Sequence, residues 1–164
     1  MKTYPKKCLY TIGYGRWTPN RRLEQLLHAL QASKINTLID IRHSPCPANP
    51  DPRSNYGPRP WHLLDAAQGL DGHLRSVGIA YQWLVELGNP QKTDPDMTVL
   101  RSHLATPDAP WPVNRGLARL YEIVQANGNH CALLCACKYY DNCHRKLIAE
   151  VFSQRFFEGG LTIL

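Results

Sequence analysis

The feature that most constrains the fold of this chain is its alternation of short β-prone runs with amphipathic helical segments. Residues 8–12 (CLYTI) and 37–41 (TLIDI) are apolar and β-prone, and Thr18-Pro19 between them is a helix-start signal. Four leucines then recur at the i, i+3, i+4 and i+7 spacing of one helix face: Leu23, Leu26, Leu27 and Leu30. A strand, a helix and a strand in about 35 residues predict a βαβ unit with parallel strands.

The same alternation continues along the rest of the chain. We predict further strands at 79–84, 131–136 and 161–164. Helices are predicted at 61–77, 96–105 and 143–157, and Gly78 is expected to end the first of them. A further helix is predicted to begin with Asn114 as its cap and to end before Gly128. At 164 residues the chain has the size of one ordinary domain. We therefore expect a single domain over residues 1–164, of the α/β class, with a layered, mostly parallel sheet flanked by helices.

Prolines interrupt this pattern between residues 45 and 60, with Asn, Asp, Ser and Gly among them. Such a density of proline is incompatible with regular helix or strand. We expect an irregular proline-rich loop at about residues 44–60.

Composition excludes several classes of protein and favours anionic partners. The longest uncharged apolar runs are far shorter than the roughly 20 residues that cross a bilayer. No apolar signal segment follows the basic residues 2–7, so a cytoplasmic location is expected. In that reducing compartment the six cysteines are expected to be buried, metal-bound or catalytic rather than disulfide-bonded. The net charge of +6 favours an anionic small molecule or nucleic acid as partner, and the sequence sets no oligomeric state.

Polar, small and thiol-bearing residues follow the predicted strands. Ligands of parallel sheets bind beyond the carboxyl ends of the strands, so we expect these residues to meet at one edge. They are Gly13, Tyr14, Gly15 and Arg16 after the first strand, Asp40, Arg42, His43 and Ser44 after the second, Glu86 and Asn89 after the third, and Cys137, Cys143, His144 and Arg145 after strand 131–136.

The Cys143-His144-Arg145 triplet at the start of the last helix is the most informative of these groups. Asp141 or Asn142 can cap that helix, which places Cys143 and His144 in its electropositive first turn. We therefore predict that the pKa of Cys143 is lowered and that its thiolate is a nucleophile. Arg145 is predicted to bind two oxygens of a phosphate or carboxylate. In the alternative interpretation Cys143 is a packing residue and Arg145 ties a loop to the sheet.

A zinc site is an alternative use of the cysteines, because five potential ligands lie within 14 residues. However, no Cys-x-x-Cys occurs among them. Cys131, Cys135 and Cys137 share parity on the predicted strand and are expected to point to one face, into packing. Only Cys137, Cys143 and His144 are expected to converge. We therefore expect no cofactor, with zinc as the alternative.

Two further patterns bear on the site. Asp40 and Arg42 share one face of a strand end. We expect them either to bind substrate, with Asp40 as a base, or to form a structural ion pair. Gly13-Tyr14-Gly15 is similar to a phosphate-cradling turn, but it lacks the rest of a Gly-x-Gly-x-x-Gly motif and a Walker lysine. A dinucleotide or P-loop site is therefore not expected.

Three segments in this order resemble the DUF488 family, a group of small cytosolic bacterial and archaeal proteins. They are residues 11–15 before a helix, residues 38–42 followed by Ser44 and Pro45, and residues 133–136 leading to Cys143-His144-Arg145. The resemblance covers nearly the whole chain. It implies an α/β fold and a site that contains Asp40, Arg42, Cys135, Cys143, His144 and Arg145, but it supplies no reaction. The chain departs from the family at Tyr14, where a histidine is usual, and at Cys137, where an acid is frequent.

These observations lead to one main functional hypothesis and two alternatives. The main hypothesis is a phosphate- or nucleotide-directed hydrolase or transferase. Its reactive groups are predicted to be Cys143, His144 and Asp40, and its ligand-binding residues Arg42, Arg145, Gly13, Tyr14, Ser44, Glu86 and Cys135. The first alternative is a non-catalytic module that binds nucleic acid or a nucleotide. The second is a zinc or thiol redox protein.

Overall fold

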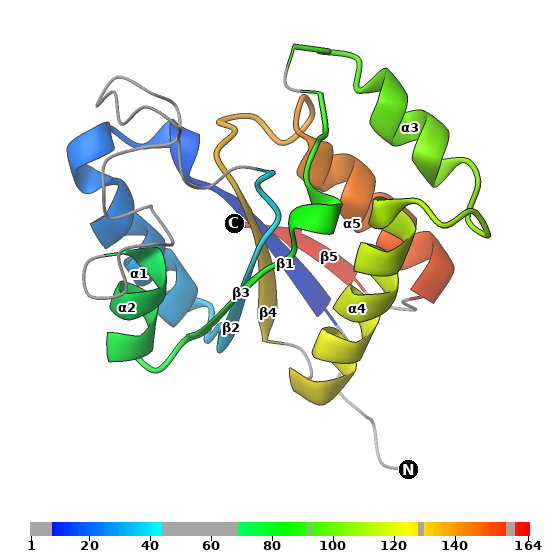
Figure 1. The fold of residues 1–164 in the computed structure, drawn as a ribbon. Helices are drawn as coiled ribbons and strands as arrows, with labels where there is room; N and C mark the ends of the chain where they lie inside the picture. Colours follow the sequence, from blue (N-terminus) through cyan, green and yellow to red (C-terminus); the bar gives the residue numbers. More distant parts are fainter. Residues whose placement is uncertain (1–7, 44–68, 92, 128–129, 157–159) are drawn as a thin grey trace.

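The fold is a parallel β-sheet with helices on both faces. In a computed structural model, the described residues are 8–43, 69–91, 93–127, 130–156 and 160–164. They form a sheet of five parallel strands in the order β3-β2-β4-β1-β5 (Figure 1). The strands are β1 (Cys8–Gly13), β2 (Thr37–Asp40), β3 (Ala80–Trp83), β4 (Cys131–Cys135) and β5 (Gly160–Ile163). The predicted α/β class with a parallel sheet is confirmed.

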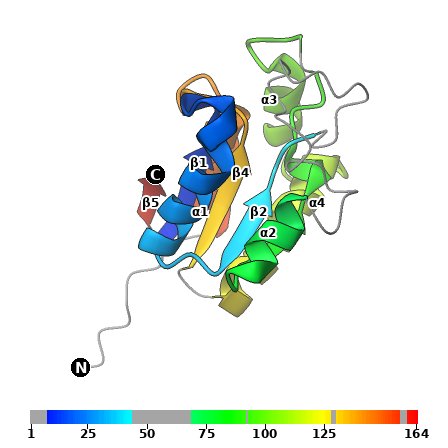
Figure 2. The ribbon, with the colours of Figure 1, turned by 90° about the vertical axis from the view of Figure 1, so that its left-hand side faces the viewer.

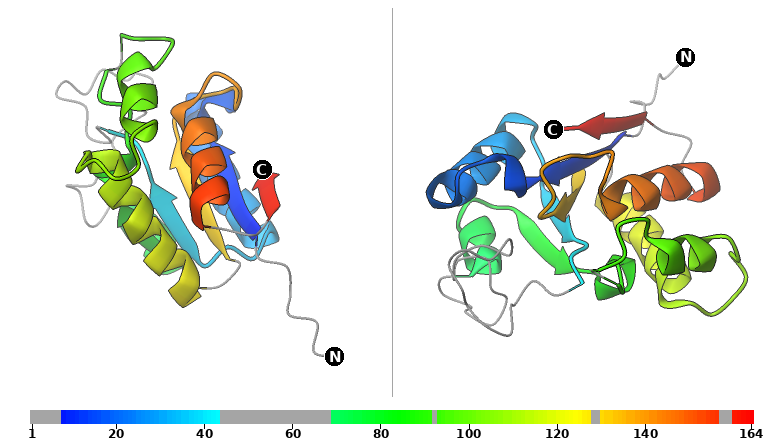
Figure 3. Two further views of the ribbon diagram at one scale, coloured as in Figure 1. Left: turned by 90° about the vertical axis from the view of Figure 1, so that its right-hand side faces the viewer. Right: turned by 90° about the horizontal axis from the view of Figure 1, so that it is seen from above.

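Five α-helices in the described part of the chain flank the sheet. They are α1 (Arg22–Ala32), α2 (Leu70–Ser76), α3 (Thr98–Leu104), α4 (Pro112–Asn127) and α5 (His144–Phe156). Helices α1 and α2 lie over one face (Figure 2), and α4 and α5 lie over the other, with α3 beside α4 (Figure 3). Short 3-10 turns occur at Tyr14–Arg16 (η1), Pro19–Arg21 (η2) and Val85–Leu87 (η4).

The core has one layer on each side of the sheet, because successive residues of β4 point to opposite faces. Leu133 packs in the layer under α3, α4 and α5. Leu134 packs in the layer under α1 and α2, which includes Leu26 and Leu30 of the predicted helix stripe. All five residues of β4 are buried, as befits the central strand.

Several local predictions need correction. The strands of the predicted βαβ unit, β1 and β2, are parallel as expected, and β4 lies between them in the sheet. Helix α1 begins at Arg22, after a 3-10 turn whose N-cap, Thr18, makes no side-chain capping bond. Helix α4 begins at Pro112, and the Asn114 amide instead donates to the carbonyls of Thr106 and Ala109.

Other boundaries agree with the sequence or fall outside the described residues. Gly78 follows α2 with a φ of 77°, the left-handed conformation expected of a helix stop. Residues 61–68 of the helix predicted before it, the proline-rich loop at about 44–60, and Gly128 lie outside the described residues. Among the described helices, none combines the length and apolar character needed to cross a membrane.

Candidate functional site

Three strands end at the same level of the sheet and bring the predicted site residues together. Gly13 at the end of β1 is in register with Cys135 at the end of β4. Asp40 at the end of β2 is in register with Leu134, one residue earlier in β4. The residues that follow these strands therefore share one edge of the sheet, as the parallel topology predicts.

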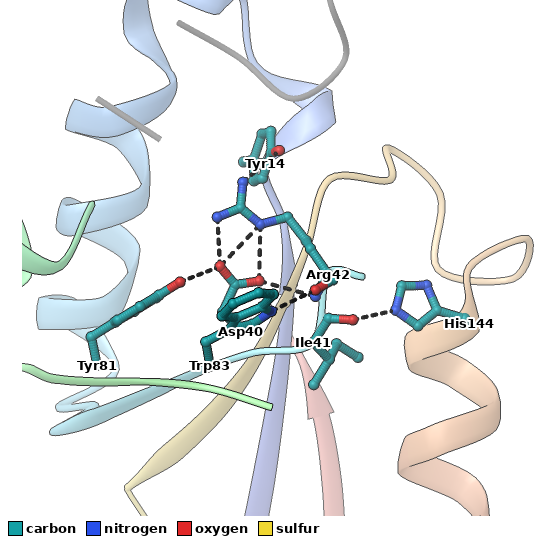
Figure 4. A network of polar contacts seen from close by, with 7 residues as sticks. All are labelled: Tyr14, Asp40, Ile41, Arg42, Tyr81, Trp83 and His144. Atoms are coloured by element: carbon teal, nitrogen blue, oxygen red, sulfur yellow. Dashed lines mark hydrogen bonds and ion pairs between the residues drawn. The ribbon is translucent and has the colours of Figure 1, made fainter. Parts of the chain in front are cut away.

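Asp40 and Arg42 form a buried ion pair at this edge (Figure 4). The Arg42 Nε donates to both Asp40 oxygens at 2.9 and 3.0 Å, and Nη2 donates to Oδ2 at 2.5 Å. Asp40 is fully buried and Arg42 is 2% exposed. Burial alone would lower the pKa of Arg42, but the charge of the Asp40 carboxylate outweighs it, so the pKa of Arg42 is raised and its guanidinium stays charged.

Two tyrosines complete the surroundings of this pair. The Tyr81 hydroxyl donates to Asp40 Oδ2 at 2.5 Å, and Arg42 Nη1 donates to the Tyr14 hydroxyl at 3.1 Å. Burial raises the pKa of Tyr14 to about 12, and burial followed by the charge of Asp40 also raises the pKa of Tyr81. Both phenols therefore keep their protons at neutral pH.

The ring of His144 is oriented by the strand end between Asp40 and Arg42. Its Nε2 lies 2.8 Å from the carbonyl oxygen of Ile41 (Figure 4). A carbonyl only accepts, so Nε2 carries a proton and donates it. Nδ1 then faces two sulfurs, at 3.6 Å from Cys135 Sγ and 3.9 Å from Cys143 Sγ.

The sulfur atoms of Cys135, Cys137 and Cys143 all lie within 4.8 Å of one another, and we call these three residues the thiol cluster. Strand parity predicted that Cys135 points into packing and away from such a cluster, and this prediction is wrong. Strand β4 ends at Cys135, so the alternation of side chains does not extend to Cys137. Cys131 does pack in the core, as predicted.

The predicted thiolate at Cys143 is also wrong. Hydrogen bonding with Cys137 and Cys143, followed by the charge of His144, lowers the pKa of Cys135 well below the usual thiol value. Hydrogen bonding with Cys135 and Cys137 raises the pKa of Cys143. Hydrogen bonding with Cys135 raises the pKa of Cys137 to about 12. Thiols so close together do not all ionise in the absence of a cation, and Cys135 holds the negative charge because His144 lies beside it. Burial alone would lower the pKa of His144, but the Cys135 charge outweighs it, so this pKa is raised.

Arg145 is buried against the loop that follows β4. It is 2% exposed, its Nη1 donates to the Cys137 carbonyl at 3.3 Å, and its Nε has no hydrogen-bond partner. A Cβ atom added to Gly13 would lie 2.0 Å from Arg145 Nη1 and 2.1 Å from the Cys137 oxygen. Glycine at position 13 thus lets Arg145 and the loop after β4 lie against the end of β1. This geometry matches the interpretation in which Arg145 ties the loop to the sheet.

A cavity of about 540 Å³ opens at this edge, and we call it the main cavity. Its described lining is polar, basic and thiol-bearing: Gly15, Arg22, Arg42, His43, Asn89, Cys135, Ala136, Cys137, Lys138 and His144. Of the residues predicted to react or to bind the ligand, Arg42, Cys135 and His144 line it, and so do Gly15, His43, Asn89 and Cys137, which were predicted at the same edge. Gly13, Tyr14, Asp40, Cys143 and Arg145 do not line it. Glu86 lines a separate cavity of about 90 Å³, and Ser44 lies outside the described residues.

The sequence analysis missed two cations of the main cavity, Arg22 and Lys138. Arg22 is the first residue of α1, and its Nε donates to the Trp17 carbonyl at 3.0 Å. A signal for it was present, because a helix that follows the first strand begins at the carboxyl edge of the sheet. Lys138 follows β4 in the same way.

Comparison with known proteins places the chain in a family. No curated protein and no solved structure matches it significantly. The family model described as "Domain of unknown function DUF488" matches residues 65–152, more than half of the chain. The match includes the thiol cluster and His144, whereas Asp40 and Arg42 precede it. As the order of its motifs predicts, the chain belongs to the DUF488 family.

Proposed function

We propose that this protein binds a phosphate-bearing anion in the main cavity. The observation that carries the proposal is the lining of this cavity. It contains three cationic side chains, Arg22, Arg42 and Lys138, and no carboxylate among its described residues. A cavity with cations and without carboxylates attracts anions, and guanidinium groups match the oxygens of phosphate.

The three cations do not contribute equally. The charge of Arg42 is balanced by Asp40, so this side chain lines the cavity without adding a net positive charge to it. Arg22 is half-buried at the start of α1 and Lys138 is exposed in the loop after β4. We therefore assign most of the attraction for the anion to Arg22 and Lys138.

Titration of the purified protein with inorganic phosphate, a nucleoside monophosphate and a short single-stranded oligonucleotide tests the proposal. The double variant Arg22→Gln/Lys138→Gln is expected to bind the best of these ligands at least tenfold more weakly, because a hydrogen bond to a charged group is worth about 1.5–3 kcal/mol. The matched control is Arg75→Gln/Arg119→Gln, which removes two exposed arginines that line neither cavity. It should bind within about twofold of the parent, since such distant charges are screened by salt.

Two results would contradict the proposal. One is the absence of binding to all three ligands at low salt. The other is an equal loss of affinity in the two double variants, which would mean that only overall charge matters. A steep fall in oligonucleotide affinity with salt, beyond that of the monophosphate, would identify nucleic acid as the ligand class.

A second candidate function is thiol-dependent transfer or hydrolysis of the bound anion. It is favoured by the position of Cys135 on the cavity wall, 3.6 Å from the His144 ring nitrogen. In such a reaction the Cys135 sulfur attacks the electrophilic atom of the ligand, the leaving group departs with a proton, and water then releases the bound group. Cys135 takes the nucleophilic role predicted for Cys143, which does not line the cavity.

This second candidate is tested with an activated phosphate ester such as p-nitrophenyl phosphate. Cys135→Ser is expected to abolish turnover while the affinity for phosphate stays the same. Turnover that survives this substitution, or none in the parent protein, would exclude thiol catalysis on phosphate esters.

A further inference from the structure

The thiol cluster and His144 gather four metal-binding atoms from four consecutive parts of the chain. Cys135 ends β4, Cys137 lies in the following loop, Cys143 directly precedes α5, and His144 is the first residue of that helix. We infer that Cys135, Cys137, Cys143 and His144 bind one zinc ion in a tetrahedral site. This inference rests on the cluster alone and does not depend on the anion proposed for the main cavity.

One sulfur–sulfur distance and two sulfur–nitrogen distances are close to those of a zinc shell. With Zn–S of about 2.3 Å and Zn–N of about 2.0–2.1 Å, a tetrahedron separates two sulfurs by about 3.8 Å and a sulfur from a nitrogen by about 3.6 Å. Cys135 Sγ lies 3.6 Å from Cys137 Sγ and 3.6 Å from His144 Nδ1, and Cys143 Sγ lies 3.9 Å from the same nitrogen. A disulfide would require about 2.0 Å, and all three cysteines are free.

The orientation of His144 fits a ligand. Metal-binding histidines donate the other ring N–H to a carbonyl or carboxylate, which fixes the ring and its tautomer. Here Nε2 donates to the Ile41 carbonyl at 2.8 Å, so the Nδ1 lone pair is directed to the side of Cys135 and Cys143. The proton position thus follows from the backbone carbonyl of Ile41, directly after β2, and not from the sulfurs.

The surroundings also balance the charge of such a site. Three thiolates and one zinc ion carry a net charge of −1, which is costly to bury without a cation nearby. The buried Arg145 side chain lies against the Cys137 carbonyl and supplies a positive charge. This gives the buried guanidinium an electrostatic role in addition to its contact with the loop.

Metal analysis of the full chain, purified without a polyhistidine tag under reducing conditions, tests the inference. We expect one zinc ion per chain and, after replacement by Co²⁺, the visible absorption of tetrahedral thiolate coordination. Cys143→Ser should lose the stoichiometric metal, whereas the matched control Cys8→Ser, at a cysteine outside the cluster, should keep it. Metal that is lost equally from both variants, or retained by both, would overturn the site.

Two further measurements keep the inference testable if Cys143→Ser does not fold. The parent protein should resist alkylation at the thiol cluster until a strong chelator removes the metal. Rapid alkylation of Cys135 in the protein as purified, or failure of the parent chain to bind added zinc, would refute the site and favour the free nucleophile. His144→Gln should weaken zinc binding at least tenfold, and an unchanged affinity would exclude His144 as the fourth ligand.

Discussion

Substitution of Asp40 by Asn tests the role of the buried ion pair directly. The change keeps the size of the side chain and removes its negative charge. Arg42, which is 2% exposed, then loses the carboxylate that accepts from its Nε and Nη2. The Tyr81 hydroxyl loses a charged acceptor at the same time.

The expected loss is large for a single substitution. Removal of one partner from a buried ion pair destabilises a protein by about 3–5 kcal/mol, because the other charge stays buried without compensation. The whole free energy of unfolding of a domain is about 5–15 kcal/mol. We therefore expect Asp40→Asn to remove a substantial part of the stability. At an m-value of about 2 kcal/mol/M, the midpoint of urea unfolding falls by about 2 M.

Asp71→Asn is the matched control, because Asp71 pairs with Arg75 on the surface of α2 at 2.7 Å. These side chains are 36% and 75% exposed, and such pairs contribute about 0–1 kcal/mol. Urea unfolding of both variants, followed by circular dichroism, measures the difference. If Asp40→Asn is no less stable than Asp71→Asn, the buried ion pair contributes no more to stability than the exposed one.

Asp40→Asn also separates the two interpretations of this residue. A catalytic base must reach its substrate, yet Asp40 does not line the main cavity. We expect the variant, at a temperature where it remains folded, to bind phosphate at least as tightly as the parent, because Asp40 no longer balances the charge of Arg42. The double variant Asp40→Asn/Arg42→Met should be more stable than the sum of its single substitutions predicts, because neither charge is then left buried without its partner.

Two further predictions concern the surroundings of this pair. Gly13→Ala should lower the free energy of unfolding by about 1–3 kcal/mol, because the new methyl group meets the Arg145 guanidinium and the Cys137 carbonyl. Gly160→Ala, where no atom lies within 4 Å, should change it by less than about 0.5 kcal/mol, and equal effects in urea unfolding would refute the contact. Tyr14 has a raised pKa of about 12, so its contribution to stability is full below pH of about 10 and is lost as the pH rises toward 12. Tyr14→Phe should therefore make the alkaline loss of stability shallower, and an unchanged slope in urea unfolding at several pH values would contradict this.

Local periodicity predicted most elements of the fold but not their order in the sheet. Leu26 and Leu30 of α1 are buried, as their spacing requires. The fully apolar β4 is a buried strand, as its composition indicates. Its position between β1 and β2 is set by pairing between residues more than 90 positions apart, and the pattern within a single strand carries no information on which strand lies beside it.

The site was predictable in its location and less so in the role of each residue. Parallel strands that end together bring Arg42, Cys135 and His144 to one cavity, which the sequence indicated. The direction of a side chain beyond a strand end depends on the loop that follows. For this reason Arg145 turns to the Cys137 carbonyl and not to the cavity, and Cys135 joins the thiol cluster instead of the core.

The ion pair and the thiol cluster are connected through a single residue, Ile41. Its neighbours in the chain are Asp40 and Arg42, its N–H donates to the Leu134 carbonyl at 3.1 Å, and its own carbonyl accepts from His144. Loss of the Asp40 charge should therefore loosen the end of β2 and, with it, the ring of His144. If the thiol cluster binds zinc, Asp40→Asn should weaken that binding at a temperature where the variant is folded, and Asp71→Asn should not. Equal zinc affinity in the two folded variants would mean that the sulfurs and helix α5 hold the site without help from the ion pair.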